Sequence, residues 1–225
     1  MCGRFVGYRN IDSLREHFPI DRVEADLSPN YNVAPTQMIP VIVRQDGENV
    51  LRTFRWGLVP FWAKDPSIGN RMINARSETI ASKPSFRDAF RKRRCLIPAD
   101  GFYEWMGKAG QKQPMLITLP GEKPFGFAGL WEVWDDKGKA EEPLYTCTII
   151  TTDASPSLQD IHHRMPVILK PEIFEKWIDE STADDALKEI LRSQFEKEFA
   201  FRPVSKAVNS AQNNSADLLK GAKPR

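Results

Sequence analysis

Short runs of β-branched and aromatic residues, separated by clusters of Gly or Pro, occupy most of the middle of the chain. Such runs favour strands over helices. Between Met38 and Trp56, two apolar runs flank Asp46 and Gly47, a pair typical of a tight hairpin turn. Further strand-like runs are Arg94 to Pro98, Met115 to Leu119, Phe125 to Trp134 and Tyr145 to Thr152. The middle of the chain is therefore expected to be mostly β.

Helical spacing of apolar residues is confined to the two ends of the chain. Residues 11–18 predict a short amphipathic helix that Pro19 ends, and residues 173–201 predict two short helices. Val204 is expected to begin a last strand. Residues 209–225 are rich in Asn, Ser, Ala and Lys, so we expect a loosely held polar tail there.

The composition indicates one soluble domain, and the expected strands and short helices place it in the α+β class. A chain of 225 residues with 41% hydrophobic side chains can bury a core of its own, and no linker or repeat divides it. We therefore assign residues 1–208 to a single domain. The formal net charge of +2 excludes bulk attraction to polyanions, so any contact with nucleic acid has to be local.

Several classes of protein do not fit the sequence. No apolar run approaches the roughly 20 residues that span a bilayer, and no signal peptide is visible. Three scattered cysteines give no disulfide framework and indicate a reducing compartment, which we take to be the cytoplasm. The cysteines and histidines lack metal-ligand spacing, and no glycine-rich phosphate loop is present. We expect no metal, no cofactor and no membrane partner.

Cys2 stands out because of its position. Removal of Met1 would leave Cys2 with a free α-amine and a thiol, whose reference pKa values are about 7.7 to 8.0 and about 8.5. The amine can condense with an aldehyde to an imine, and the neighbouring thiol can then close a five-membered thiazolidine ring. The alternative is that Cys2 is a small residue in a buried first strand.

Three polar clusters in apolar surroundings could supply partners for this chemistry, namely residues 74–78, 100–105 and 162–166. In the second, Glu104 lies between aromatic residues that could raise its pKa and suit it to acid and base work. Each cluster also has a structural interpretation, as a turn cap, an ion pair or a satisfied histidine. The basic run 91–94 is interpreted as a solvated helix end.

Taken together, these stretches resemble the SRAP (SOS response-associated peptidase) family of abasic-site-processing proteins. The matching segments are MCGRF at the start, YNVAPTQ from Tyr31, RWGLVPFWAKD from Arg55, NARSET from Asn74, RRCLIPADGFYEW from Arg93, FAGLWE from Phe127 and IHHRMPVIL from Ile161. They follow the family's order across nearly the whole chain. The expected fold is a β-rich, barrel-like core of mixed sheets with short helices around it.

The resemblance implies a role for each cluster. Cys2, after loss of Met1, would capture the ring-opened aldehyde of an abasic site as a thiazolidine. Asn74 would orient the sugar and the terminal amine, and Glu104 would assist sugar opening and imine formation. His162 would shuttle protons, although a shift of one residue would give that role to His163.

The resemblance also implies the partner and its contacts. Arg76 and Arg164 look like the family's phosphate-binding arginines, with Arg4 beside the nucleophile, and the partner would be single-stranded DNA that contains abasic sites. Phosphate contacts position a strand without reading its sequence. The crosslink would shield the site during the DNA damage (SOS) response, with the protein at the nucleoid as a monomer. Lyase activity is a further possibility, and the family name raises an autoproteolytic cysteine peptidase activity.

Two other functions remain open on the sequence. A start of Met, Cys and Gly also fits an N-terminal-nucleophile peptidase or amidohydrolase, which would predict hydrolysis of glutamine or a peptide. A noncovalent single-stranded DNA-binding module, with an inert Cys2, would predict salt-dependent binding to intact DNA and no stable adduct.

Overall fold

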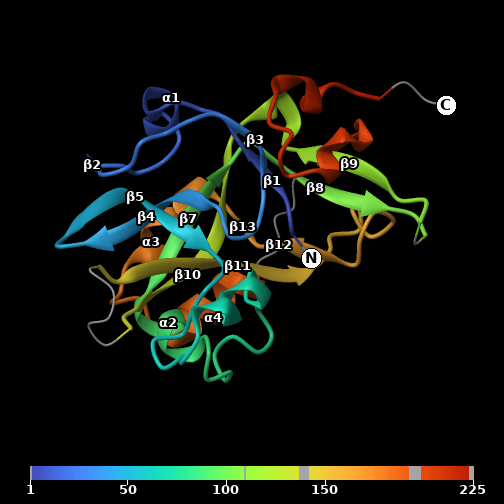
Figure 1. Ribbon diagram of the computed structural model, residues 1–225. Coiled ribbons are helices and arrows are strands. Elements are labelled where there is room, and N and C mark those ends of the chain that lie inside the picture. The colour runs from blue at the N-terminus through green and yellow to red at the C-terminus, as the bar shows by residue number, and fades with distance from the viewer. Residues whose placement is uncertain (1, 109, 137–141, 193–198, 223–225) are drawn as a thin grey trace.

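The computed structural model describes residues 2–108, 110–136, 142–192 and 199–222 (Figure 1). Its strands form two mixed sheets. The larger has the order β12-β11-β10-β7-β4-β5-β2, with β13 beside β10 and β6 beside β11, and the smaller has the order β14-β9-β8-β1-β3. The strands of the larger sheet are β2 (Arg22–Val23), β4 (Met38–Gln45), β5 (Glu48–Trp56), β6 (Asn74–Arg76), β7 (Arg94–Ala99), β10 (Phe125–Trp134), β11 (Leu144–Asp153), β12 (Arg164–Pro166) and β13 (Ile168–Leu169). Those of the smaller sheet are β1 (Phe5–Gly7), β3 (Asn30–Val33), β8 (Gly101–Met106), β9 (Gln113–Thr118) and β14 (Ala200–Pro203).

The larger sheet closes on itself through β11. Besides its antiparallel partner β10, this strand pairs in parallel with β5, with Thr146 opposite Arg55 and Cys147 opposite Trp56. The pairing joins the ends of the path β11-β10-β7-β4-β5 and makes a closed barrel of five strands. The expected α+β domain with a barrel-like core is confirmed.

Alternating side chains divide the apolar residues into an inner and an outer layer. On β4, Val41 and Val43 belong to the core inside the barrel, whereas Ile42 between them packs with the helices outside. The helices are α1 (Ile11–Arg15), α2 (Arg87–Lys92), α3 (Phe174–Ile178) and α4 (Asp184–Arg192). Figure 1 shows α2 and α4 below the barrel, with β8, β9 and the red C-terminal segment on the opposite side.

Most of the predicted elements are present. Asp46 and Gly47, with φ of 52° and 83°, form the two-residue turn between β4 and β5 that the sequence predicts. The four other predicted strands correspond to β7, β9, β10 and β11, and the predicted helices correspond to α1, α3 and α4. Residues 193–198 of the second helical stretch lie outside the described residues.

Three expectations are wrong. The last strand ends at Pro203, and Val204 makes only an isolated bridge to Gly221. The C-terminal segment is held rather than loose as far as Ala222, because Leu218 is buried together with Val204 and Val208 against Val6, Tyr103 and Leu116 of the smaller sheet. In the basic run, Arg94 is not solvated: it is 2% exposed and donates hydrogen bonds to carbonyl oxygens of Phe90, Arg91, Trp177 and Asp179.

Candidate functional site

Cys2 lies just before β1, at the edge of the barrel core. Its side chain is fully buried in the inner apolar cluster that also contains Phe5, Trp56 and Cys147. The Sγ atom is 3.9 Å from the carbonyl oxygen of Arg4. Burial raises the pKa of the thiol well above its usual range, and the nearby charge of Glu104 raises it further. The thiol is therefore protonated at neutral pH, so a base has to remove its proton.

Glu104 is positioned beside Cys2 by the pairing of β1 with β8. Phe5 lies opposite Phe102, and the backbone N–H of Tyr103 donates to the carbonyl oxygen of Arg4 at 3.0 Å. Continuing this antiparallel register toward the N-terminus brings the residues around Cys2 alongside Glu104. Glu104 is on the same face of β8 as Phe102, which belongs to the inner cluster, because side chains alternate along a strand.

The environment of Glu104 suits proton transfer. The residue is only 4% exposed, and burial raises the pKa of its carboxyl from 4.5 to about 7. This confirms the expectation that apolar surroundings raise that pKa. At neutral pH the carboxyl is then near half-protonation, where a group serves best as both acid and base.

Asn74 begins β6, which runs parallel to β11 with Asn74 opposite Ile149. The carbonyl oxygen of Ile73 accepts from Nδ2 of Asn74 and from Nε1 of Trp56, each at 2.9 Å. The Asn74 Oδ1 atom is buried and has no hydrogen-bond partner among the described residues. A buried amide oxygen in this condition is an acceptor available to an incoming N–H or O–H group.

His162 lies in the loop between β11 and β12. The backbone N–H of Arg164 donates to its Nδ1 at 2.9 Å, and the carbonyl oxygen of Arg164 lies 3.1 Å from the same nitrogen. The shorter contact comes from a group that can only donate, which favours the neutral ring with its hydrogen on Nε2. Burial lowers the pKa of His162 to about 4, so the ring is neutral at pH 7. Exposed His163 stacks on it with ring centroids 4.4 Å apart. Of the two histidines, only His162 has a half-buried ring that is held by the backbone. The assignment of the proton-shuttle role to His162 rather than His163 stays a prediction.

The three predicted phosphate-binding arginines differ in their surroundings. Arg76, at the end of β6, is exposed. Arg4 donates to Asn32 Oδ1 and to the carbonyl oxygen of Val208, both at 2.7 Å. The Arg164 side chain is 8% exposed and forms ion pairs with Glu78 and Asp153.

Lys112 is a residue of this site that sequence reasoning missed. It is exposed and immediately precedes β9, which pairs with β8. The charge of Lys112 lowers the pKa of Glu104, in opposition to the larger effect of burial, which raises it. For His162, burial and the charge of Lys112 both lower the pKa. One ammonium group thus lies near both titrating groups. Its sequence context, between two glutamines, carries no signal of this role.

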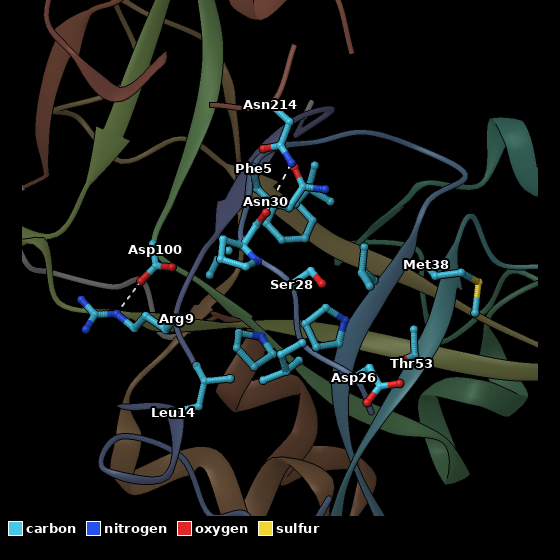
Figure 2. A pocket seen from close by; sticks show the side chains of 18 residues that line it. Phe5, Arg9, Leu14, Asp26, Ser28, Asn30, Met38, Thr53, Asp100 and Asn214 are labelled. Atoms are coloured by element: carbon cyan, nitrogen blue, oxygen red, sulfur yellow. Dashed lines mark hydrogen bonds and ion pairs between the residues drawn. The ribbon is translucent and has the colours of Figure 1, made fainter. Parts of the chain in front are cut away.

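A separate cavity of about 250 Å³ lies between β1, β4 and the segment 26–30 (Figure 2). Figure 2 shows Met38 and Asp26 on one side of it and the Arg9–Asp100 ion pair, 2.6 Å long, on the other. None of the predicted site residues lines this cavity. It is therefore distinct from the Cys2 site.

The described part of the chain offers neither a metal-binding cluster nor a membrane-spanning helix. Residues 2–108, 110–136, 142–192 and 199–222 contain no group of three or more His, Cys, Asp or Glu side chains placed to hold a metal ion. Within the same ranges, no helix has the length and apolar character needed to cross a bilayer.

Comparison with known proteins places the chain in a family. Residues 1–211 match the family described as SOS response associated peptidase (SRAP), and the chain belongs to this family. It is 45% identical over 223 residues to the abasic site processing protein YoqW of Bacillus subtilis, covering 97% of this chain and 99% of that protein. It is 40% identical over 249 residues to the abasic site processing protein HMCES of Gallus gallus, covering 96% and 73%.

The fold has a counterpart among solved structures. A crystal structure of a protein from Bacteroides thetaiotaomicron superimposes with a TM-score of 0.85 at 30% identity, covering 99% of this chain and all of that one. A phage-related protein of Bordetella bronchiseptica gives a TM-score of 0.72 at 30% identity. The barrel and the strands around it are thus shared with experimentally determined structures.

Proposed function

We propose that this protein processes abasic sites in single-stranded DNA by forming a covalent crosslink through Cys2 after Met1 has been removed. The proposal is supported by the names of relatives that match nearly the whole chain. The observation that carries it here is the placement of Cys2, by the β1–β8 register, beside a buried carboxyl whose pKa is raised to about 7.

The proposed reaction has three bond-forming or bond-breaking stages. The Cys2 α-amine adds to the C1′ aldehyde of the ring-opened sugar and gives a carbinolamine. The carbinolamine loses its hydroxyl as water and becomes an imine. The thiol then adds to the imine carbon, and its proton passes to the imine nitrogen, which closes the thiazolidine. The balance is one aldehyde plus one aminothiol giving one ring and one water.

Glu104 and His162 divide the proton transfers. Glu104, near half-protonation at neutral pH, protonates the departing hydroxyl and then removes the proton from the buried Cys2 thiol. His162 is neutral and its Nε2–H donates toward the sugar oxygen that opens. Asn74 Oδ1, buried and without a partner among the described residues, accepts a hydrogen bond from the α-amine and directs its lone pair to the aldehyde.

The exposure of each arginine side chain determines its proposed role at the DNA phosphates. Arg76 is the direct phosphate contact, because its side chain is exposed two residues after Asn74. Arg4 and Arg164 contribute positive charge at the edge of the site while their guanidinium groups stay hydrogen-bonded within the protein. A single strand suits the buried position of Cys2, since the sugar has to approach the nucleophile without a paired strand behind it.

A peptidase function for the same residues is the second candidate. The pairing of Cys2 with Glu104 would serve removal of Met1 by the protein itself, and the family's description names a peptidase. Lyase activity would follow from the same imine if the sugar's 3′ phosphate were eliminated before the thiol closed the ring.

The test is intact mass spectrometry of the protein alone and after incubation with an oligonucleotide carrying one abasic site. We expect loss of Met1 and a gain equal to the oligonucleotide minus one water, stable to denaturant. Cys2→Ala should give no adduct, whereas Cys147→Ala, which removes another thiol of the same buried cluster, should keep it. A duplex with the same abasic site tests the preference for a single strand.

The possible results separate the candidates. An adduct on Cys2→Ala would refute capture by this residue. Binding without an adduct in the native protein would leave the noncovalent module. Retention of Met1 in a Glu104→Gln variant, with its loss in the native protein, would support self-processing, and loss of Met1 in both would refute it.

A further inference from the structure

The guanidinium of Arg164 joins segments that are distant in the sequence. Its Nη1 donates to Glu78 Oε1 at 2.6 Å and to Asp153 Oδ1 at 2.7 Å. Its Nη2 donates to Glu78 Oε2 at 3.1 Å and to the carbonyl oxygen of Thr151 at 2.8 Å. The bridge to Glu78 is therefore bidentate, the arrangement in which an arginine is held most firmly.

The bridge crosses a strand of the barrel. In β11, Thr151 pairs with Arg76 of β6 on one side and with Pro166 of β12 on the other. Glu78 follows the end of β6 by two residues, and Arg164 begins β12. The Glu78–Arg164 bridge thus ties the segment that carries Asn74 to the segment that carries His162.

The position of Arg164 has a direct effect on His162. The backbone N–H and the carbonyl oxygen of Arg164 lie 2.9 Å and 3.1 Å from Nδ1 of His162, and the shorter contact, with the N–H, favours the ring hydrogen on Nε2. We propose that Glu78 is a positioning residue of the site, which acts through Arg164 to hold His162 in the Nε2–H tautomer and in register with Asn74. The inference rests on the proposed function for the role of His162 in capture, but the orientation itself is a property of the free protein.

Glu78 is better suited to this role than Asp153. Asp153 accepts one hydrogen bond and its side chain is 78% exposed, whereas Glu78 accepts two and is 46% exposed. The hydrogen bond from Arg164 lowers the pKa of Glu78, so the bridge is charged at neutral pH. The ladders of β11 with β6 and with β12 hold the backbones of the three strands, and the Glu78–Arg164 bridge adds a direct side-chain link between the outer two.

The experiment compares the native protein with Glu78→Gln, which keeps the shape of the side chain and removes its charge. Long-range ¹H–¹⁵N correlation spectra of the histidine rings at pH 7, with His162 assigned through a His162→Gln variant, report the tautomer. We expect the Nε2–H form in the native protein and a mixture of both tautomers in Glu78→Gln. Glu175→Gln is the matched control, since Glu175 pairs with Arg44 away from the site.

Capture kinetics provide the second readout. For Glu78→Gln we expect the maximal rate of adduct formation to fall roughly ten- to hundredfold, because misplacement of an acid or base by about 1 Å costs that much. The DNA concentration for half-maximal rate should stay within about twofold, since Glu78 makes no proposed contact with DNA. Glu78→Asp, which keeps the charge, should recover part of the rate.

Each result decides the inference. An Nδ1–H tautomer in the native protein would overturn it without any variant. A Glu78→Gln protein that is less stable, but keeps the native tautomer and the native rate per folded molecule, would show a merely structural role. If Glu78→Gln does not fold, the same spectra of Glu78→Asp decide. A native protein that forms no adduct would contradict the proposed function, while the tautomer spectra would still decide the positioning role.

Discussion

Glu104 allows a quantitative prediction about stability, because its carboxyl is buried and its pKa is raised from 4.5 to about 7. Below about pH 4.5, the folded and unfolded chains both hold the proton. Between about pH 4.5 and 7, only the unfolded chain releases it, so the unfolded state binds fewer protons and the free energy of unfolding falls as pH rises. Above pH 7 both states are ionised, and the loss is complete.

The size of the effect follows from the same values. One pKa unit corresponds to about 1.36 kcal/mol, so the rise to about 7 makes ionised Glu104 cost about 3 kcal/mol of stability above neutral pH. Glu104→Gln cannot ionise. The free energy of unfolding of the variant, relative to that of the native protein, should therefore increase by about 3 kcal/mol between pH 4 and pH 8.

The assay is urea unfolding followed by tryptophan fluorescence at unit steps of pH over this range. The measured quantity is the change with pH of the difference in free energy of unfolding between Glu104→Gln and the native protein. Any constant cost of burying the glutamine amide cancels in this change. Glu175→Gln, an exposed control, should show no such change. A difference for Glu104→Gln that stays constant or decreases with pH would refute the reasoning, and with it the assignment of Glu104 as an acid and base near neutrality.

Three further predictions concern the framework. Gly129→Ala would place a Cβ 2.8 Å from Cys95 Sγ and 3.1 Å from the carbonyl oxygen of Thr148, and urea unfolding should show a loss of about 1 to 3 kcal/mol. Arg94→Ala would leave the buried carbonyl oxygens of Phe90 and Trp177, and the partly buried one of Asp179, without this donor, so its free energy of unfolding should fall by more than about 3 kcal/mol, whereas an unchanged value would contradict the observed bonding. Arg4→Ala would remove the donor to the carbonyl oxygens of Val208 and Asn209, so limited proteolysis should cut within 205–222 faster than in the native protein.

The sequence predicted those parts of the fold that depend on neighbouring residues alone. The turn at Asp46 and Gly47 and strands such as β10 are readable because residue type and spacing suffice there. The parallel pairing of β11 with β5 that closes the barrel is not readable, since it joins segments far apart in sequence. The held C-terminal segment was missed because only a few apolar residues, such as Val208 and Leu218, anchor an otherwise polar stretch.

In the candidate site too, residues with a local sequence signal were predicted, whereas those that act across distant segments were not. Cys2 was proposed from its position, and Glu104, Asn74 and His162 were proposed as polar residues in apolar surroundings and then through the family resemblance. Lys112 and Glu78 were assigned no role, because their effects on other residues arise across strands and loops. Sequence reasoning also could not show that Arg4 and Arg164 are hydrogen-bonded within the protein.

The bond from Arg4 to Val208 bears on how the protein is made. The guanidinium of Arg4, two residues after Cys2, is held by a carbonyl oxygen that the ribosome adds 204 residues later. During translation, the segment that carries Cys2 and Arg4 therefore lacks its final supports until nearly the whole domain has emerged. Under the proposed function, a nascent chain that has lost Met1 would present its aminothiol before the pocket is assembled, and capture would become selective only when synthesis of the domain is complete.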